Sequence, residues 1–405
     1  MKKISLKELK KIVNTTSVPD KNVEVSVKTI IDSVRQDGDK ALLSLTKKFD
    51  GIDLQSIKIP ISEINEAEKN LDVQLKKSIK VVIKRVEKYH KNQLPSDFKI
   101  KEKGLTLEYK FSPIEKVGVY VPAGQSPLLS TLIMTCVPAI VAGVKKIYVA
   151  SPPTSNKKIH PSILGTLGLL GLKDIFAMGG AQAIAAFAYG TETMPQVDLI
   201  TGPGNKYVDT AKKLLYGTVG IDLPAGPSEV AIFADSSADI DFVKKDLLAQ
   251  GEHTDSKVFL ITTSEQLGKK ISANVKTGFW IYVKTKKEAL NIINLISPEH
   301  LQVMCKNPEE ISTKAIAGTI LLGNHSPAAL GDYFAGPSHV LPTGRTARFA
   351  SGLSVYTFLR KYAVIKAEQS FYDDNQESMK TLADTEGLVY HSESLSARSN
   401  RKKNE

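Results

Sequence analysis

The sequence predicts an α/β protein in which parallel sheets are flanked by helices. From about residue 116 to 283, apolar strand-like segments alternate with Gly-rich turns and helical segments, as in "KVGVYVPAG" followed by "PLLSTLIMTCVPAIVAG". Such alternation is typical of parallel strands joined by helical crossovers. It falls into two series, which predicts two α/β units. A chain of 405 residues is long enough for two or more domains with their own cores.

The N-terminal part is predicted to be mostly helical. Residues 1–20 have the pattern of a short amphipathic helix and a linker that ends at "TSVPD". Residues 22–95 continue with helical periodicity, clearest in "LKKSIKVVIKRVEKYHKNQL". The stretch "LTLEYKFSPIEKVGVYV" then alternates as a strand does.

The two α/β series follow. The first continues through "KKIYVASPP", "DIFAMGG" and "VDLITGPGN", each before a helical segment. The second runs through "SEVAIFAD", a helix that ends at Gln250, "KVFLITT", a further helix and "GFWIYVKT". From about residue 354 the chain becomes polar and is predicted to be helical, with a basic tail.

Composition excludes several classes of protein. The net charge is +11, but the lysines are scattered and the one dense basic run is the terminal "SARSNRKKNE", so we expect no nucleic-acid partner. No uncharged stretch approaches the length of a membrane span, so no membrane partner is expected. The N-terminus has no apolar signal core, and the two cysteines are too far apart for a CxxC site. These features predict a cytoplasmic protein.

Gly-rich loops follow several predicted strands, at 121–124, 178–183, 201–205 and 224–229. Glycine lets a backbone approach a ligand closely, and ligands of open parallel sheets bind at the carboxyl ends of strands. No loop has the G-x-G-x-x-G spacing of the standard dinucleotide fingerprint. A nicotinamide cofactor would therefore need a different loop chemistry.

The stretch "SPEHL" at 297–301 has the pattern of a helix start. Ser297 would be the N-cap and Pro298 the first helical residue. At a helix N-terminus Glu299 would stay ionised and His300 would remain available as a neutral base. The same residues therefore allow a structural or an acid–base interpretation.

Other polar residues are candidates for a metal site. On a helix, Gln250 and His253 of "AQGEHT" would share one face. Together with Asp332 and His391 they are nitrogen and oxygen ligands of the types that suit a zinc-class ion, although their spacing alone does not establish a site. Asp332 could equally be a turn carboxylate, and the segment with Glu386 and His391 a solvated tail. We expect His339 to be a structural hydrogen-bonding residue and Cys136 a buried packing residue.

Eight blocks in order resemble histidinol dehydrogenase over about residues 25–395. They are "VGVYVPAG", "MGGAQAIAAFAYGT", "ITGPGNKYVDTAK", "GIDLPAGPSEV", "LLAQGEH", "SPEHLQV", "GDYFAGPSHVLPT" and "ARFASGLSV". The resemblance implies a zinc-dependent homodimer that oxidises L-histidinol to L-histidine in two NAD-dependent steps, through L-histidinal, at the end of histidine biosynthesis. It implies one Zn²⁺ per subunit.

The resemblance also assigns residues. Glu299 would activate water and His300 would transfer protons. The implied metal ligands are Gln250, His253, Asp332 and, from the partner subunit, His391. The implied substrate contacts are Ser228, Gln250, His253, Glu299, His300, Asp332, Glu386 and His391, with Glu386 also from the partner chain. The implied NAD contacts are Tyr120, Gln182 and Asn205.

The fold implied by the resemblance is α/β, with two incomplete Rossmann-like domains that are doubly wound and mostly parallel, and small N- and C-terminal helical extensions. We expect an N-terminal arm at 1–21, a discontinuous first domain at 22–118 and 229–353, and an inserted second domain at 119–228. Residues 354–405 would form a dimer-crossing segment.

Three other functions remain open at this level. One is a relative that oxidises another polar alcohol, such as a sulfonated diol, on the same scaffold. A second is a phosphate-ligand binder or zinc hydrolase without redox chemistry, which the Gly-rich loops alone would allow. A third is an inactive member with a regulatory role, which the full set of expected site residues disfavours.

Overall fold

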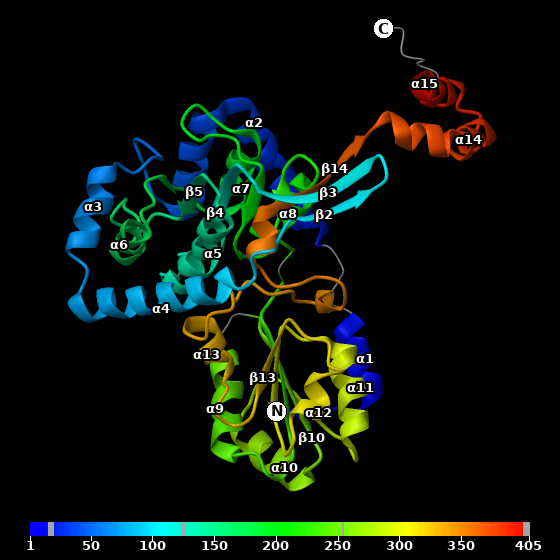
Figure 1. Ribbon diagram of the computed structural model, residues 1–405. Coiled ribbons are helices and arrows are strands. Elements are labelled where there is room, and N and C mark those ends of the chain that lie inside the picture. The colour runs from blue at the N-terminus through cyan, green and yellow to red at the C-terminus, as the bar shows by residue number, and fades with distance from the viewer. Residues whose placement is uncertain (15–19, 124–126, 225, 253–254, 400–405) are drawn as a thin grey trace. The chain divides into compact units, whose positions relative to one another are not determined.

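The computed structural model describes residues 1–14, 20–123, 127–224, 226–252 and 255–399. Contacts divide the chain into two units, one of residues 1–93 and 114–358 and a smaller one of residues 94–113 and 359–405. The larger unit contains two parallel sheets and the smaller one an antiparallel sheet (Figure 1). No helix in the described ranges is long and apolar enough to cross a membrane.

The first parallel sheet has the strand order β6-β5-β4-β7-β8. Its strands are β4 (Lys116–Tyr120), β5 (Lys146–Ser151), β6 (Ile175–Ala177), β7 (Leu199–Thr201) and β8 (Gly220–Ile221). In chain order this is 3-2-1-4-5, the doubly wound order of an incomplete Rossmann-like domain, with its switch point between β4 and β7.

Two layers of helices cover this sheet (Figure 1). On one face α2 (Lys21–Asp50) packs against α7 (Gly180–Tyr189) and α8 (Lys206–Leu215) in one apolar cluster. On the other face lie α5 (Leu129–Ala142) and α6 (Pro161–Leu169), with α4 (Val73–Lys91) and α3 (Ile61–Lys69) packed against them. Cys136 of α5 is completely buried, which confirms its prediction as a packing residue.

The second parallel sheet has the order β1-β11-β10-β9-β12-β13. Its strands are β1 (Lys2–Lys3), β9 (Glu229–Ala234), β10 (Lys257–Thr262), β11 (Phe279–Tyr282), β12 (His300–Met304) and β13 (Thr319–Leu322). Without β1 the order is again 3-2-1-4-5, so the predicted fold class of two incomplete Rossmann-like units is confirmed.

Helices cover both faces of this second sheet as well (Figure 1). One face carries α1 (Leu6–Asn14) and α11 (Lys286–Ile296), and the other α9 (Ile240–Gln250) and α10 (Glu265–Asn274). The short helices α12 (Glu309–Ser312) and α13 (Ala328–Tyr333) follow, and then the 3₁₀ turns η2 (Thr346–Arg348) and η3 (Val355–Phe358).

The smaller unit is an antiparallel sheet with two helices. Its sheet has the order β14-β3-β2, from β2 (Phe98–Glu102), β3 (Leu105–Pro113) and β14 (Leu359–Ala367), and α14 (Gln369–Thr385) and α15 (Val389–Ser399) follow. The prediction that the chain is helical from about residue 354 is wrong for β14. Eight of the nine residues of β14 are exposed, so no buried face imposes the period-two alternation that would have predicted a strand.

The packing differs from the expected domain boundaries at the N-terminus. Residues 1–14 are not a separate arm, because β1 pairs with β11 and Leu9 and Val13 lie in the core under α11. Helices α2, α3 and α4 pack on the helices that cover the five-stranded sheet rather than with residues 229–353. An amphipathic helix shows in its sequence which face is buried, but not which sheet buries it.

A buried ion pair holds the loop at the switch point of the five-stranded sheet. The Lys212 ammonium and the Asp222 carboxylate pair with 2% and 0% of their side chains exposed. Lys212 Nζ donates to the carbonyl of Gly202 at 3.0 Å, and the Gly202 amide donates to Asp222 Oδ2 at 2.8 Å. Gly202 has φ +109°, and a Cβ there would overlap the carbonyl of Tyr120. The pair therefore fixes a backbone turn that other residues cannot adopt.

We predict that Lys212→Met destabilises the protein by about 3–5 kcal/mol, because it leaves the Asp222 carboxylate buried without a counter-charge. Urea unfolding would measure this loss. Lys91→Met is the matched control, since the exposed Lys91–Glu87 pair in α4 should contribute less than about 1 kcal/mol. Equal losses in the two variants would contradict the assigned role of the buried pair.

Candidate functional site

Three of the expected site residues lie at the amino edge of the six-stranded sheet. Strand β12 begins at His300, directly after Glu299, and His300 is aligned with Val230 of the neighbouring strand β9. Ser228 immediately precedes β9. The structure therefore brings Ser228, Glu299 and His300 to one edge, although they come from distant parts of the sequence.

The predicted helix start at "SPEHL" is wrong. Helix α11 ends at Ile296, and Ser297 is its C-cap, with the left-handed φ of 45° and its amide donating to the carbonyl of Ile293 at 2.7 Å. Ser297 therefore ends a helix, and the residues after it enter a buried strand. Ser-Pro-Glu fits an N-cap locally, but burial in the sheet overrides that preference.

The pKa of Glu299 therefore differs from the value expected at a helix N-terminus, where the carboxylate would stay ionised. Glu299 has 6% exposure, and burial raises its pKa to about 7, although the nearby His300 opposes this rise. Glu299 Oε2 accepts a hydrogen bond from the Glu229 amide at 2.8 Å. A carboxyl group that titrates near neutrality can exchange protons at physiological pH, which suits acid–base chemistry.

His300 lies between two carboxyl groups. It has 4% exposure, and burial disfavours its charged form, but the hydrogen bond with Asp332 and the charge of Glu299 outweigh burial and raise its pKa. Its Nε2 lies 3.2 Å from Asp332 Oδ1, and its Nδ1 lies 3.8 Å from Glu299 Oε2. The imidazole is therefore not a simple neutral base in this structure.

Asp332 is held on a short helix. It lies in α13, and its carboxylate keeps a quarter of its surface exposed. The Nδ1–H of His339 donates to the Asp332 carbonyl at 2.9 Å, so Nε2 of a neutral His339 accepts from the hydroxyl of Thr131 in α5, at 3.1 Å. His339 is thus a structural hydrogen-bonding residue, as predicted.

Gln250 is a buried amide at the end of α9. Its side chain has 5% exposure, and its Nε2 has no hydrogen-bond acceptor among the described residues. Helix α9 contacts α13, which carries Asp332. The helix ends at Gln250 with Gly251 as its C-cap. His253 itself lies outside the described residues.

Glu386 and His391 belong to the smaller unit. Glu386 is the C-cap of α14 and His391 lies in α15, and both are exposed there. Their proposed contribution to a site on another subunit therefore stays a prediction.

The expected cofactor contacts lie at the carboxyl edge of the five-stranded sheet. Tyr120 ends β4, and its buried hydroxyl accepts from the Gly180 amide at 3.1 Å, with burial raising its pKa to about 12. Gln182 is buried in the first turn of α7, and Asn205 is the exposed N-cap of α8. Tyr120 ends β4, and Gln182 and Asn205 lie at the starts of the helices that follow β6 and β7, so all three are at the carboxyl edge, where open α/β sheets bind ligands.

Sequence reasoning missed Glu229. This carboxyl group is 4% exposed beside Glu299, and burial raises its pKa, while Lys257 at 3.6 Å and the Gly344 amide at 3.2 Å oppose the rise. Its amide is the donor to Glu299 Oε2. An acidic residue at the start of the buried run "EVAIFA" was the available signal, because such a run seldom contains a charge.

The donors present fit a zinc-class ion. Within the described ranges, no three His, Cys, Asp or Glu side chains gather closely enough to hold a metal. Gln250 is an amide and His253 lies outside the described residues, so neither is among these side chains. The Asp332 carboxylate and the amide oxygen of the buried Gln250 are ligands of the type that Zn²⁺ accepts.

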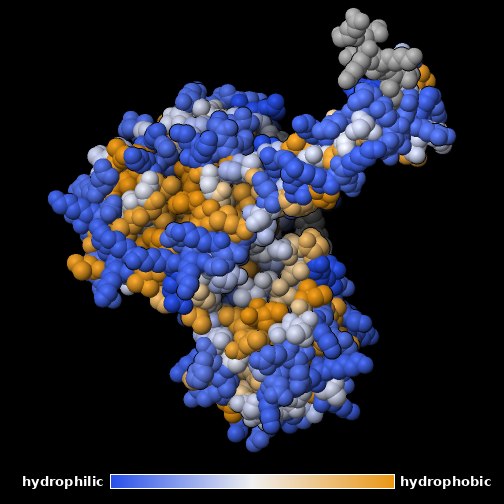
Figure 2. All heavy atoms as spheres, viewed as in Figure 1, coloured by the Kyte–Doolittle hydropathy of each residue, from blue (hydrophilic) through white to orange (hydrophobic). Residues whose placement is uncertain are grey.

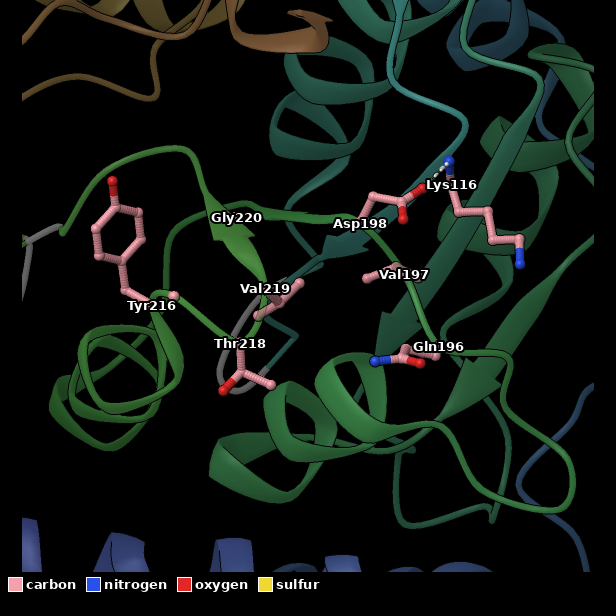
Figure 3. Close-up of a pocket in the computed structure, with 9 residues that line it drawn as sticks. Lys116, Gln196, Val197, Asp198, Tyr216, Thr218, Val219 and Gly220 are labelled. Atoms are coloured by element: carbon pink, nitrogen blue, oxygen red, sulfur yellow. Dashed lines mark hydrogen bonds between the residues drawn. The ribbon is translucent and has the colours of Figure 1, made fainter. Parts of the chain in front are cut away.

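A separate surface cavity lies away from these residues. It has a volume of about 510 Å³ and is lined by Lys116, Gln196, Asp198, Tyr216 and Thr218, among others (Figure 3). Its walls are the amino ends of β4, β7 and β8, opposite the Gly-rich loops. None of the expected site residues lines it, so it is not the candidate site.

Comparison with known proteins identifies relatives over nearly the whole chain. The family model described as histidinol dehydrogenase matches residues 13–399. The chain is 42% identical to a histidinol dehydrogenase of Prochlorococcus marinus, covering 96% of this chain and 94% of the relative. It is 41% identical to one of Bacillus subtilis, with 93% of each covered. A crystal structure of histidinol dehydrogenase from Elizabethkingia anophelis superposes with a TM-score of 0.91 at 34% identity, covering 98% of this chain and 97% of that one.

We predict that Glu299→Gln stabilises the metal-free protein more at pH 8 than at pH 5. The carboxyl pKa is about 4.3 in unfolded chains and about 7 here, so the native state favours the protonated form and loses stability as pH rises through this interval. The glutamine cannot ionise and escapes this loss. Thermal unfolding at both pH values measures the difference, with Glu309→Gln, an exposed acid of α12, as control. A stabilisation that does not grow with pH would show that Glu299 is ionised throughout.

Proposed function

The chain belongs to the histidinol dehydrogenase family, and we propose that it oxidises L-histidinol to L-histidine in two NAD-dependent steps, through L-histidinal, with one Zn²⁺ per subunit. The reaction would complete histidine biosynthesis. The observation that carries the proposal is the buried pair of Glu299 and His300 against the Asp332 carboxylate. Removing two hydrides from one carbon requires repeated proton transfer, and this pair supplies two groups that can exchange protons.

The two groups take different roles in the proposal. In each oxidation the neutral form of His300 accepts the proton of the hydroxyl group as the hydride leaves the carbon, and its raised pKa strengthens it as a base. In the second oxidation Glu299 accepts a proton from the water that adds to the aldehyde. A pKa of about 7 lets Glu299 be ionised for this step and return its proton to solvent afterwards. The Glu229 amide holds one oxygen of Glu299, which fixes the direction of the other.

The metal site in the proposal uses residues from two chains. Gln250, His253, Asp332 and His391 of the partner subunit would hold the zinc ion. When bound, it would orient the substrate through its imidazole and amino nitrogens rather than generate hydroxide. The amide of Gln250 is neutral, so this ligand set leaves more positive charge for nitrogen donors. Ser228 and the Glu386 carboxylate of the partner subunit would contact the cationic substrate.

Tyr120, Gln182 and Asn205 form the cofactor site in the proposal. When bound, NAD accepts the hydride from the substrate carbon. Support comes from the position of these residues at the carboxyl edge of the five-stranded sheet, after β4, β6 and β7. The pair Lys212–Asp222 fixes the Gly202 turn beside them, so the loop would need little reordering when NAD binds.

A twofold dimer would complete the site. In the smaller unit Leu359 and Ala383 are the buried apolar residues, whereas Ile365, Leu382, Val389 and Tyr390 are 62–84% exposed. A segment with so small a core gains stability by packing on another surface. In the larger unit, hydrophobic residues gather over α5 and α6 (Figure 2). Exchange of the smaller units between two copies would produce two equivalent sites.

We predict that the purified protein, given zinc and excess NAD, forms two NADH per L-histidinol consumed. Glu299→Gln should slow the second oxidation, assayed with L-histidinal, more than the first, because the alcohol step needs no water. Absorbance at the NADH band with quantified histidine measures both. One NADH per substrate, or activity only with another alcohol such as a sulfonated diol, would contradict the proposal. Equal slowing of the two steps would remove Glu299 from water activation.

We predict that His391→Asn lowers zinc retention without changing the thermal stability of the metal-free protein, because the residue is exposed in its own unit. Mixing this variant with inactive Asp332→Asn should restore up to about a quarter of the wild-type activity, since half of the sites in each mixed dimer would be intact. Zinc content and activity after joint refolding are the measurements. Full zinc content in His391→Asn, or no recovery on mixing, would exclude a ligand from the partner chain.

A further inference from the structure

A buried amide connects the elements that carry the proposed metal and acid–base residues. Gln302 lies in β12 and is completely buried. Its Nε2 donates to Asp246 Oδ2 of α9 at 2.9 Å and to the carbonyl of Ser326 at 3.2 Å. Ser326 directly precedes Pro327, the N-cap of α13. One side chain therefore ties α9 and the start of α13 to the same central strand.

The connection lies close in sequence to each proposed site residue. Gln302 follows His300 by two positions, so both side chains are on the same face of the sheet. Asp246 precedes Gln250 by four positions and lies on the same face of α9. That face, with Val243 and Leu247, packs on the sheet in one apolar cluster with Met304 of β12. Asp246, which Gln302 contacts, is thus one helical turn from Gln250. Gln302 itself is two strand residues from His300.

Stability alone does not account for a glutamine at this position. Its Oε1 is buried and has no donor among the residues that the structure describes. The Asp246 carboxyl, which accepts one of its hydrogen bonds, is half-buried, and burial raises the Asp246 pKa despite that bond. A buried acceptor without a donor costs free energy that a leucine or methionine would not cost. Polar groups kept at such positions set geometry rather than stability.

We propose that Gln302 is a positioning residue that holds α9 and α13 against β12, so that Gln250 and Asp332 face His300 at the spacing required by metal and substrate. This inference rests on the proposed function. Gln302 touches none of the reacting groups and acts through Asp246 and Ser326. Loss of the bridge would let the two helices shift independently over the strand.

The test compares Gln302→Leu with the wild-type full-length protein. We expect the leucine variant to fold with unchanged or higher thermal stability, but to bind zinc about ten- to a hundredfold more weakly in competition with a chelator. Its KM for histidinol should rise more than its kcat falls. Asp246→Leu should reproduce the effect, and the double variant should be no worse than either single one. Asp246→Asn keeps an acceptor for Gln302 and should retain near wild-type affinity.

Thr262→Val is the matched control, because Thr262 is a completely buried polar residue in β10 of the same sheet whose hydroxyl hydrogen-bonds with Ser264 rather than with α9 or α13. It should leave zinc affinity unchanged. Wild-type zinc affinity in Gln302→Leu, or a loss matched by Thr262→Val, would overturn the proposal.

Hydrogen exchange tests the positioning role of Gln302 even if the proposed function is wrong. If the wild-type protein binds no zinc and forms no NADH, the function fails. The bridge is then judged by amide exchange in residues 328–333 and at Gln250 in the metal-free protein. Faster exchange in Gln302→Leu than in Thr262→Val supports the positioning role, and unchanged exchange rejects it.

Discussion

The site depends on the burial of an acid and an imidazole side by side at the amino edge of a parallel sheet. Burial by itself would neutralise both Glu299 and His300. The Asp332 carboxylate reverses this effect for the imidazole of His300 and raises its pKa. The Glu299 carboxyl group keeps a raised pKa of about 7. Glu299 and His300 act on each other as sequence neighbours, but the burial that raises the Glu299 pKa and the Asp332 contact that raises the His300 pKa come from the packing of β9, β12 and α13.

A second constraint is the connection between the two parallel sheets. Ligands of a doubly wound sheet bind at its carboxyl edge, where Tyr120 and the Gly202 turn lie. The acid–base pair instead lies at the amino edge of the other sheet. The chain passes from the carboxyl end of β8 through residues 222–228 directly into the amino end of β9, so the two edges are joined. Thr343 accepts the Gly226 amide within this connection, and Thr131 of α5 binds His339. The proposed substrate residues and the proposed cofactor residues are therefore linked by this connection.

Buried polar groups recur at the contacts that hold the elements around the expected site residues in place. Lys212–Asp222, Glu229–Lys257 and Gln302–Asp246 each place a polar or charged side chain where an apolar one would cost less. Each holds a loop, strand start or helix next to an expected site residue. In the smaller unit, by contrast, large apolar residues are exposed. Its expected functional residues, Glu386 and His391, are exposed as well. Both features fit a site completed by association of two chains.

The sequence by itself determined the α/β class, the two parallel units and the identity of the family. Strand–glycine–helix alternation is a local pattern. Long sequence blocks such as "ITGPGNKYVDTAK" can be matched to the family without knowing which residues are in contact. Only the tertiary structure decided that α2 to α4 pack on the helices covering the five-stranded sheet, that β14 is a strand and that Glu299 leads into strand β12 rather than into a helix. It also decided the pKa of Glu299 and the bridge through Gln302. Apolar periodicity records how much of a segment is buried, whereas the surface that buries it, and the charges found there, come from residues far away in the chain.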